Sequence, residues 1–128
     1  MSTIRWASTV AFVVALAGCA AGRIEGMAQA LPAGGYGLTV ELVNFVFRPN
    51  VITVDAERPI MVTAVSRSIA KHNVTVISSD GELVADVDVP AGQTRTFEMT
   101  LRRPGSYELY CVIGLHKSLG MAGLFVAR

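Results

Sequence analysis

The sequence predicts an all-β protein: a Greek-key antiparallel β-sandwich of about seven or eight strands, preceded by an N-terminal export signal. Apolar and polar residues alternate with period two, as in strands that are buried on one face. Turn-forming residues interrupt these runs at short intervals, and no convincing amphipathic helix is present. At 128 residues the chain is long enough for one domain with a core and too short for two.

The expected strands follow one another closely along the chain. Four runs rich in β-branched residues span residues 38–47, 51–54, 60–65 and 72–77. Alternation then predicts two further strands, whose core-facing residues would be Leu83, Ala85, Val87, Val89, Phe97, Met99 and Leu101. A last expected strand, around residue 107, leads to Cys111. The turns between strands carry Pro, Gly, Asn or Asp, at Arg48-Pro49-Asn50, Asp80-Gly81, Pro90-Ala91-Gly92 and Arg103-Pro104-Gly105.

Residues 1–19 have the pattern of an export signal. A basic residue, Arg5, precedes an apolar run over residues 7–17 that is shorter than the roughly 20 residues a membrane span needs. The run ends in Leu16-Ala17-Gly18-Cys19, which resembles a bacterial lipobox, so we expect Cys19 to be acylated. Cleavage at Ala28-Gln29-Ala30, or retention of the whole segment as an anchor, are alternatives that would also export the domain.

An Ala- and Gly-rich segment without periodicity, residues 20–35, is expected to be a flexible tether, followed by the folded domain over residues 36–128. We therefore expect a lipid-anchored protein on the extracytoplasmic or periplasmic face of a cell membrane. With 11 basic and 10 acidic residues the chain has no basic stripe, which argues against nucleic-acid binding. A hydrophobic content of 52% excludes an extensively disordered chain.

Cysteine usage indicates a metal site. If Cys19 carries lipid, the exported domain retains a single thiol, Cys111, which calls for intermolecular pairing, a reactive role or a metal. Cys111, His116 and Met121 are spaced C-x4-H-x4-M, so a thiolate, an imidazole and a thioether can converge on one ion. Tyr107, Leu109 and Cys111 share one strand face, which would point the sulfur into the core.

His72 is the only other histidine of the chain. It opens an expected strand in which His72, Val74 and Val76 share a face. Taken singly, a buried thiol, a core methionine and a surface histidine are the ordinary interpretations of these residue types. Taken together, two histidines and a cysteine in a trigonal arrangement with a weak axial methionine make a blue-copper site. We therefore expect one type 1 copper ion held by His72, Cys111, His116 and Met121.

These motifs resemble the cupredoxin family. Besides C-x4-H-x4-M-x-G, Gly105-Ser106-Tyr107 leads into the cysteine strand as in the family's G-x-Y-x-x-x-C, Phe45-Val46-Phe47-Arg48-Pro49 resembles its opening strands, and His72-Asn73-Val74 resembles its His-Asn-Val ligand motif. The loop spacing is similar to that of rusticyanin and auracyanin. By this resemblance Asn73 would hydrogen-bond near the cysteine-bearing loop. One departure is Gly114-Leu115, where many relatives have Pro-Gly before the loop histidine.

The resemblance implies a monomeric carrier of single electrons rather than an enzyme, since four protein ligands leave no open coordination position for a substrate. His116 would be the route by which electrons leave. An apolar collar of Ile113, Leu115 and Leu119 around it would dock redox proteins such as a cytochrome, an oxidase or a reductase. A copper carrier or delivery protein that uses the same ligands is the alternative. A metal-free interaction module is a third hypothesis for the function.

Overall fold

The computed structural model describes residues 27–128, so the expected export signal and Cys19 lie outside the described residues. This part of the chain forms ten strands and no helix, and accordingly contains no helix that could cross a membrane. In chain order the strands are β1 (Ala28–Ala30), β2 (Gly37–Val43), β3 (Val46–Arg48), β4 (Val51–Val54), β5 (Pro59–Ser66), β6 (His72–Ser78), β7 (Leu83–Val89), β8 (Thr94–Thr100), β9 (Gly105–Tyr110) and β10 (Ala122–Ala127).

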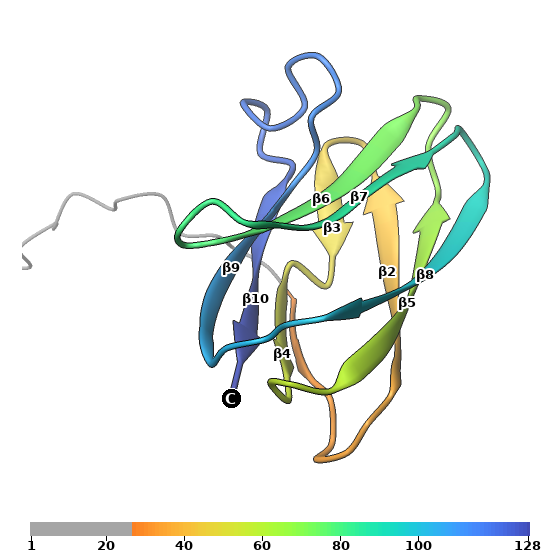
Figure 1. Ribbon diagram of the computed structural model, residues 1–128. Coiled ribbons are helices and arrows are strands. Elements are labelled where there is room, and N and C mark those ends of the chain that lie inside the picture. The colour runs from red at the N-terminus through yellow and green to blue at the C-terminus, as the bar shows by residue number, and fades with distance from the viewer. Residues whose placement is uncertain (1–26) are drawn as a thin grey trace, which may run out of the picture.

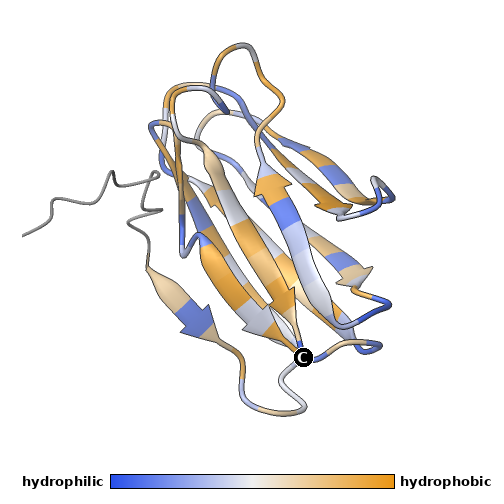
Figure 2. Cartoon of the chain, turned by 90° about the vertical axis from the view of Figure 1, so that its left-hand side faces the viewer, coloured by the Kyte–Doolittle hydropathy of each residue, from blue (hydrophilic) through white to orange (hydrophobic). Residues whose placement is uncertain are grey.

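The strands form two sheets that pack against each other (Figure 1). One sheet has six strands in the order β1-β4-β10-β9-β6-β7, and the other has four in the order β3-β2-β5-β8. Figure 2 shows apolar and polar residues alternating along these strands, which places one apolar face of each sheet in a shared core. The predicted β-sandwich is confirmed.

Three strand pairs are parallel, whereas we expected antiparallel strands throughout. β1 and β10 both run parallel to β4, and β2 runs parallel to β5. Parallel neighbours need a crossover rather than a hairpin, and the chain supplies it by changing sheets between β3 and β4 and again between β4 and β5. The number of strands also exceeds the prediction, partly because the run over residues 38–47 splits into β2 and β3 at a turn.

The ordered fold begins earlier than the expected domain boundary at Tyr36. Residues 28–30 form β1, which pairs with β4. Leu31 is buried in the core, and its carbonyl oxygen accepts a hydrogen bond from Arg128 Nη2 at 2.6 Å. Asp55 accepts hydrogen bonds from Gly34 N at 2.7 Å and from Arg128 Nε at 2.9 Å. The second half of the segment expected to be a tether is therefore bound to the sandwich, because an unpaired edge of β4 was available to it.

The register between β6 and β7 shifts at one point. An irregularity between Val76 and Ile77 pairs Ile77 with Leu83. As a result Leu83 is exposed, while Val84 packs against the core. The predicted alternation therefore holds for Ala85 and Val89, and it is wrong for Leu83. The extra residue at a bulge reverses the alternation, so residues on its two sides face opposite sides of the sheet.

The turn between β2 and β3 has an unusual backbone. Val43 and Val46 are paired, so the turn has two residues, Asn44 and Phe45, with φ of 22° and 68°. Positive φ at both positions is the requirement of a tight hairpin turn, which glycine satisfies best at the second position. A bulky residue in this left-handed region costs about 1–2 kcal/mol.

Close packing of two backbones explains a glycine in β10. A Cβ atom at Gly123 would lie 2.1 Å from the carbonyl oxygen of Asn50. The same oxygen accepts a hydrogen bond from Leu124 N at 2.7 Å, which joins β10 to the start of β4. Gly123 follows Met121 by two residues, so this contact lies beside one of the expected metal ligands.

Replacing Gly123 with alanine should therefore destabilise the protein by about 1–3 kcal/mol, because a backbone neighbour cannot move aside as a side chain can. Urea unfolding followed by circular dichroism would measure the change. The matched control is Gly37→Ala, because nothing lies within 4 Å of a Cβ at Gly37 and alanine is tolerated better than glycine within a strand. Equal midpoints for the two variants would contradict the packing argument.

Candidate metal centre

His72 is the first residue of β6, and its side chain is fully buried. It shares the core face of the strand with Val74 and Val76, as expected from the alternation of side chains. Lys71, just before the strand, forms an ion pair with Asp88 at 2.6 Å, which holds this end of β6 to β7. The imidazole therefore enters the interior of the sandwich at its edge.

Cys111 directly follows β9, whose core-facing residues are Tyr107 and Leu109. The strand is anchored at its start, because the Tyr107 hydroxyl donates to Arg103 O at 2.9 Å and accepts from Arg103 N at 3.0 Å. At its other end Cys111 N donates to Met121 O at 3.2 Å. The thiol is buried and forms no disulfide with any residue that the structure describes.

The loop after Cys111, residues 112–120, turns the chain back so that His116 faces the cysteine. Backbone hydrogen bonds close its turns, among them His116 N to Ile113 O at 3.0 Å, Gly120 N to Lys117 O at 3.0 Å, and Met121 N to His116 O at 2.9 Å. Gly120 has a φ of 107°, a conformation that suits glycine and few other residues. Figure 1 shows this loop at the top of the molecule, beyond the ends of the strands.

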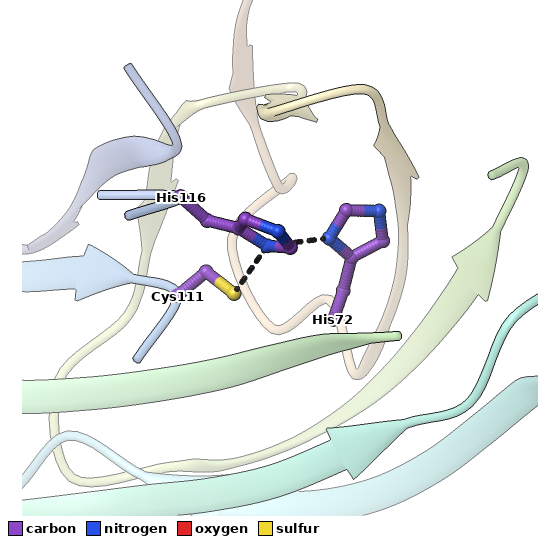
Figure 3. A group of neighbouring side chains, drawn as sticks. All are labelled: His72, Cys111 and His116. Atoms are coloured by element: carbon purple, nitrogen blue, oxygen red, sulfur yellow. Dashed lines mark hydrogen bonds between the residues drawn. The ribbon is translucent and has the colours of Figure 1, made fainter. Parts of the chain in front are cut away.

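Three potential ligand atoms meet at this end of the sandwich. The Nδ1 atoms of His72 and His116 are 3.3 Å apart, and Cys111 Sγ is 3.5 Å from His116 Nδ1 (Figure 3). Ligand atoms of the three residues all lie within 4.8 Å of one another. Their convergence was predicted from the sequence, although the residues come from two strands and a loop.

The spacing fits a trigonal metal site. Bonds of about 2.0–2.1 Å to imidazole nitrogen and about 2.3 Å to thiolate sulfur, at trigonal angles, separate the two nitrogens by about 3.5 Å and sulfur from nitrogen by about 3.8 Å. The observed separations of 3.3 and 3.5 Å differ from these values by only a few tenths of an ångström. The third pair, Cys111 and His72, has its ligand atoms within 4.8 Å, so the three side chains are close enough to share one ion.

The electrostatic environment favours ligation by His72. Burial lowers the pKa of the His72 imidazole, and the nearby His116 lowers this pKa further. The ring is therefore neutral at physiological pH, which is the form that binds metals. Its Nε2 atom is buried and has no hydrogen-bond partner among the described residues, so metal binding at Nδ1 would be the principal polar interaction of this ring.

The backbone of Met121 is hydrogen-bonded to two of the other expected ligands, Cys111 and His116. Its backbone nitrogen and oxygen bond to His116 and Cys111 respectively, and its side chain is fully buried. A thioether at this position is shielded from water by the core.

Asn73 does not make the contact that the family resemblance implied. Its side-chain amide donates to Asp86 Oδ1 at 2.8 Å and to Asp88 Oδ1 at 3.0 Å, and its oxygen accepts from the Thr75 hydroxyl. As the neighbour of His72 in a strand, Asn73 faces the opposite side of the sheet, where β7 presents these carboxylates. The interaction therefore fastens β6 to β7 and does not extend to the loop that follows Cys111.

Two residues at the site were not singled out as site residues by sequence reasoning. The Phe45 ring meets the His116 ring edge-on, with centroids 4.8 Å apart and planes at 64°. Lys117 Nζ lies 3.9 Å from the centroid of the Tyr110 ring and 2.5 Å from Glu108 Oε1. The position of Lys117 next to His116 was a usable signal, whereas nothing near Phe45 in the sequence indicates its contact.

The expected apolar collar is present in part. Leu115 and Leu119 are 71% and 58% exposed, whereas Ile113 is half-buried and packs against the core. Val112 and the fully exposed Ile69, from the connection between β5 and β6, are further exposed apolar residues in the segments next to Cys111 and His72. The end of the molecule that carries the ligands is therefore largely apolar.

Comparison with solved structures identifies the same fold. The chain is similar to reduced auracyanin from the photosynthetic bacterium Roseiflexus castenholzii, with a TM-score of 0.68 and 20% identity over 76% of this chain and 99% of the other. Auracyanin A, a "blue" copper protein from Chloroflexus aurantiacus, has a TM-score of 0.60 and 16% identity over 72% and 99% of the two chains. Reduced rusticyanin has a TM-score of 0.61 and 16% identity over 77% and 83%.

No curated protein sequence matches the chain significantly. The family model of the cupredoxin-like domain, in contrast, matches residues 8–123, which is most of the chain. This match agrees with the two-sheet fold and with the cluster of two imidazoles and one thiol at the end of the sandwich. The chain therefore belongs to the cupredoxin-like family, and its His72, Cys111 and His116 are positioned to bind a single copper ion.

Proposed function

We propose that this protein is an exported, membrane-tethered electron carrier whose type 1 copper ion is held by His72, Cys111, His116 and Met121. The observation that carries the proposal is the convergence of two Nδ1 atoms and one Sγ atom at separations of 3.3 and 3.5 Å, next to a fully buried methionine. When bound, copper supplies a one-electron couple between its two oxidation states. The remaining properties of the carrier come from the chain.

Each proposed ligand has a distinct position. Cys111 would provide the thiolate and Met121 the weak axial thioether, both fully buried, and His72 would provide the buried imidazole. His116 is only half-buried, so its outer edge is the shortest path from the ion to a partner. We assign electron exit and entry to this edge.

The frame that holds the ligands is suited to fast electron transfer. β6 and β9 are neighbouring antiparallel strands, and they carry His72 and Cys111 on the same face. Because hydrogen-bonded strands inside a packed sandwich cannot shift independently, both oxidation states would be held in nearly the same geometry. Little reorganisation would then accompany each electron.

The apolar end around His116 supports docking of a redox protein, such as a cytochrome, an oxidase or a reductase. Lys71 and Lys117, each adjacent to a proposed ligand, are paired with Asp88 and Glu108. Little unpaired charge is left there to steer a charged partner. A small apolar contact of this kind suits brief encounters, because a carrier must release its partner after each transfer.

Burial of the ligands favours electron transfer over copper delivery. A delivery protein must pass its ion to new ligands one at a time, which requires access to the ion from solvent. His72, Cys111 and Met121 are each fully buried, so only His116 could be exchanged without opening the sandwich. We therefore consider the copper carrier the weaker alternative.

The membrane attachment rests on the sequence of the first 30 residues. We propose acylation of Cys19 in the lipobox-like Leu16-Ala17-Gly18-Cys19. Residues 20–26 would then lie between the lipid and Met27, the first residue that the structure describes. The domain would then work at the extracytoplasmic face of a membrane. Mass spectrometry of the membrane-extracted protein would test this proposal through the mass of the N-terminal lipid.

Copper-loaded, oxidised protein should be intensely blue, and Cys111→Ser should abolish the colour, because the absorption arises from the copper–thiolate bond. Visible absorption spectra with parallel metal analysis would measure the effect. Val112→Ser is the matched control, since this neighbouring side chain is exposed and makes no part of the proposed site. A blue Cys111→Ser protein would exclude the thiolate assignment.

Met121→Leu should keep copper bound and raise the reduction potential, because loss of the thioether donor disfavours the higher oxidation state. A redox titration followed at the blue absorption band would report the change. Met99→Leu removes the sulfur of another buried methionine, in β8, and should leave the potential near its original value. Complete loss of copper from Met121→Leu would contradict a weak axial role.

Leu115→Asp should slow electron self-exchange between oxidised and reduced copies by about tenfold or more, because two copies must bring their apolar ends together and a buried charge opposes this. Line broadening in NMR spectra of partly oxidised samples gives the exchange rate. The control is Leu83→Asp, because Leu83, the first residue of β7, is also exposed and lies outside the apolar end. Equal rates in the two variants would exclude the apolar end as the docking surface.

A further inference from the structure

Among the residues that the structure describes, two aromatic rings contact the His116 ring, those of His72 and Phe45. The Phe45 and His116 centroids are 4.8 Å apart with an interplanar angle of 64°, an edge-on arrangement. The His72 ring also lies beside the His116 ring, with centroids 5.0 Å apart. The His116 imidazole therefore has an aromatic neighbour besides the histidine that faces it in Figure 3.

The backbone at Phe45 is poorly suited to phenylalanine. Its φ of 68° lies in the left-handed region, where the second residue of a two-residue hairpin turn is best occupied by glycine. A bulky side chain in this region is a true conformational outlier. Such residues persist where the surrounding structure requires them, and they cluster at functional sites.

Apart from the contacts of its Nδ1 atom with His72 and Cys111, the His116 imidazole has few other side-chain contacts that could orient it. The hydrogen bonds of the loop that bears it are mostly internal, such as His116 N to Ile113 O and Leu119 N to Leu115 O. Lys117 contacts Tyr110 and Glu108 on the opposite face of β9 from Cys111. Neither set of contacts acts directly on the His116 ring.

We propose that Phe45 is a positioning residue of the metal site, and that the strained turn is retained because it presents the phenyl ring to His116. The ring restricts rotation of the imidazole and keeps its Nδ1 directed toward Cys111 and His72 before the ion binds. This inference rests on the proposed function, in which His116 is a copper ligand. It assigns a role in the site to a turn that supplies no ligand.

The alternative is that Phe45 only fills space, since it also packs against the apolar core. Phe45→Leu separates the two roles, because leucine keeps an apolar side chain at the same backbone position and removes the ring. Phe97→Leu is the matched control: Phe97 of β8 is likewise half-buried against the core, and it is paired with Val62 rather than placed at His116.

Copper release to a strong chelator is the first measurement. Phe45→Leu should release copper about two- to tenfold faster than the original protein, the range that corresponds to one aromatic pair. Phe45→Tyr, which keeps the ring, and Phe97→Leu should release it at the original rate. Equal rates for Phe45→Leu and Phe97→Leu would overturn the proposal.

A second measurement uses copper-free protein. NMR relaxation dispersion of the His116 ring carbons should detect exchange between ring orientations in Phe45→Leu and not in Phe97→Leu. Unfolding by urea then tests the strain: Phe45→Gly should be more stable than Phe45→Ala, since both lose the ring and only glycine suits the positive φ. A rigid His116 in Phe45→Leu, or a Phe45→Ala protein as stable as Phe45→Gly, would contradict the corresponding part of the proposal.

These experiments also distinguish the two proposals. If the unaltered protein takes up no copper, the proposed function fails, while the copper-free dispersion measurement still decides whether Phe45 orients His116. If the unaltered protein is blue and Phe45→Leu matches it in copper release and in ring motion, the positioning role alone is excluded.

Discussion

The antiparallel register of β6 and β9 is the constraint on which the metal centre depends. Thr75 is paired with Tyr110, and Val76 with Leu109. Continued along the strands, this register sets Cys111 opposite Val74, so that His72 is its diagonal neighbour on the same core-facing side. A slip of one residue would carry the thiol to the outer face and leave the imidazole without a partner. The hydrogen bonds of the sheet thereby determine which two side chains can share an ion.

Around this pair, the rest of the sandwich limits how far the ligands can move. The Tyr107 hydroxyl anchors the start of β9 at Arg103, and Asn73 joins β6 to the carboxylates of β7. The close packing of Gly123 against Asn50, with the hydrogen bond from Leu124 N to Asn50 O, joins the strand after Met121 to β4. Each contact lies outside the trio of ligand atoms, yet together they leave the interior of the site with little freedom. Such stiffness is what a carrier needs if it is to exchange electrons without rearranging.

The loop that carries His116 differs from this rigid frame. It extends beyond the strands, exposes Leu115 and Leu119, and contributes the one proposed ligand that solvent reaches. Docking requires such exposure, whereas ligation requires a fixed imidazole. Under the proposed function, this conflict would be met by contacts from the body of the domain: the Phe45 ring against the imidazole, and Lys117 against Tyr110 and Glu108. The strain in the β2–β3 turn is then a local cost that accompanies a well-placed ligand.

The class of fold and the three residues that carry the ligand atoms could be predicted from the amino-acid sequence, because both leave regular patterns along the chain. Alternation of apolar residues reports burial on one strand face, and the C-x4-H-x4-M spacing with a single further histidine left few other groups for a metal. Three features became visible only in the folded chain: the parallel pairing around β4, the attachment of residues 28–34 to the sandwich, and the exposure of Leu83 at a bulge. The same holds for the side chain of Asn73, which is turned toward β7, and for the contact of Phe45 with His116. These features depend on which strands become neighbours and in which register, and pairing between distant segments leaves no periodic trace in the chain.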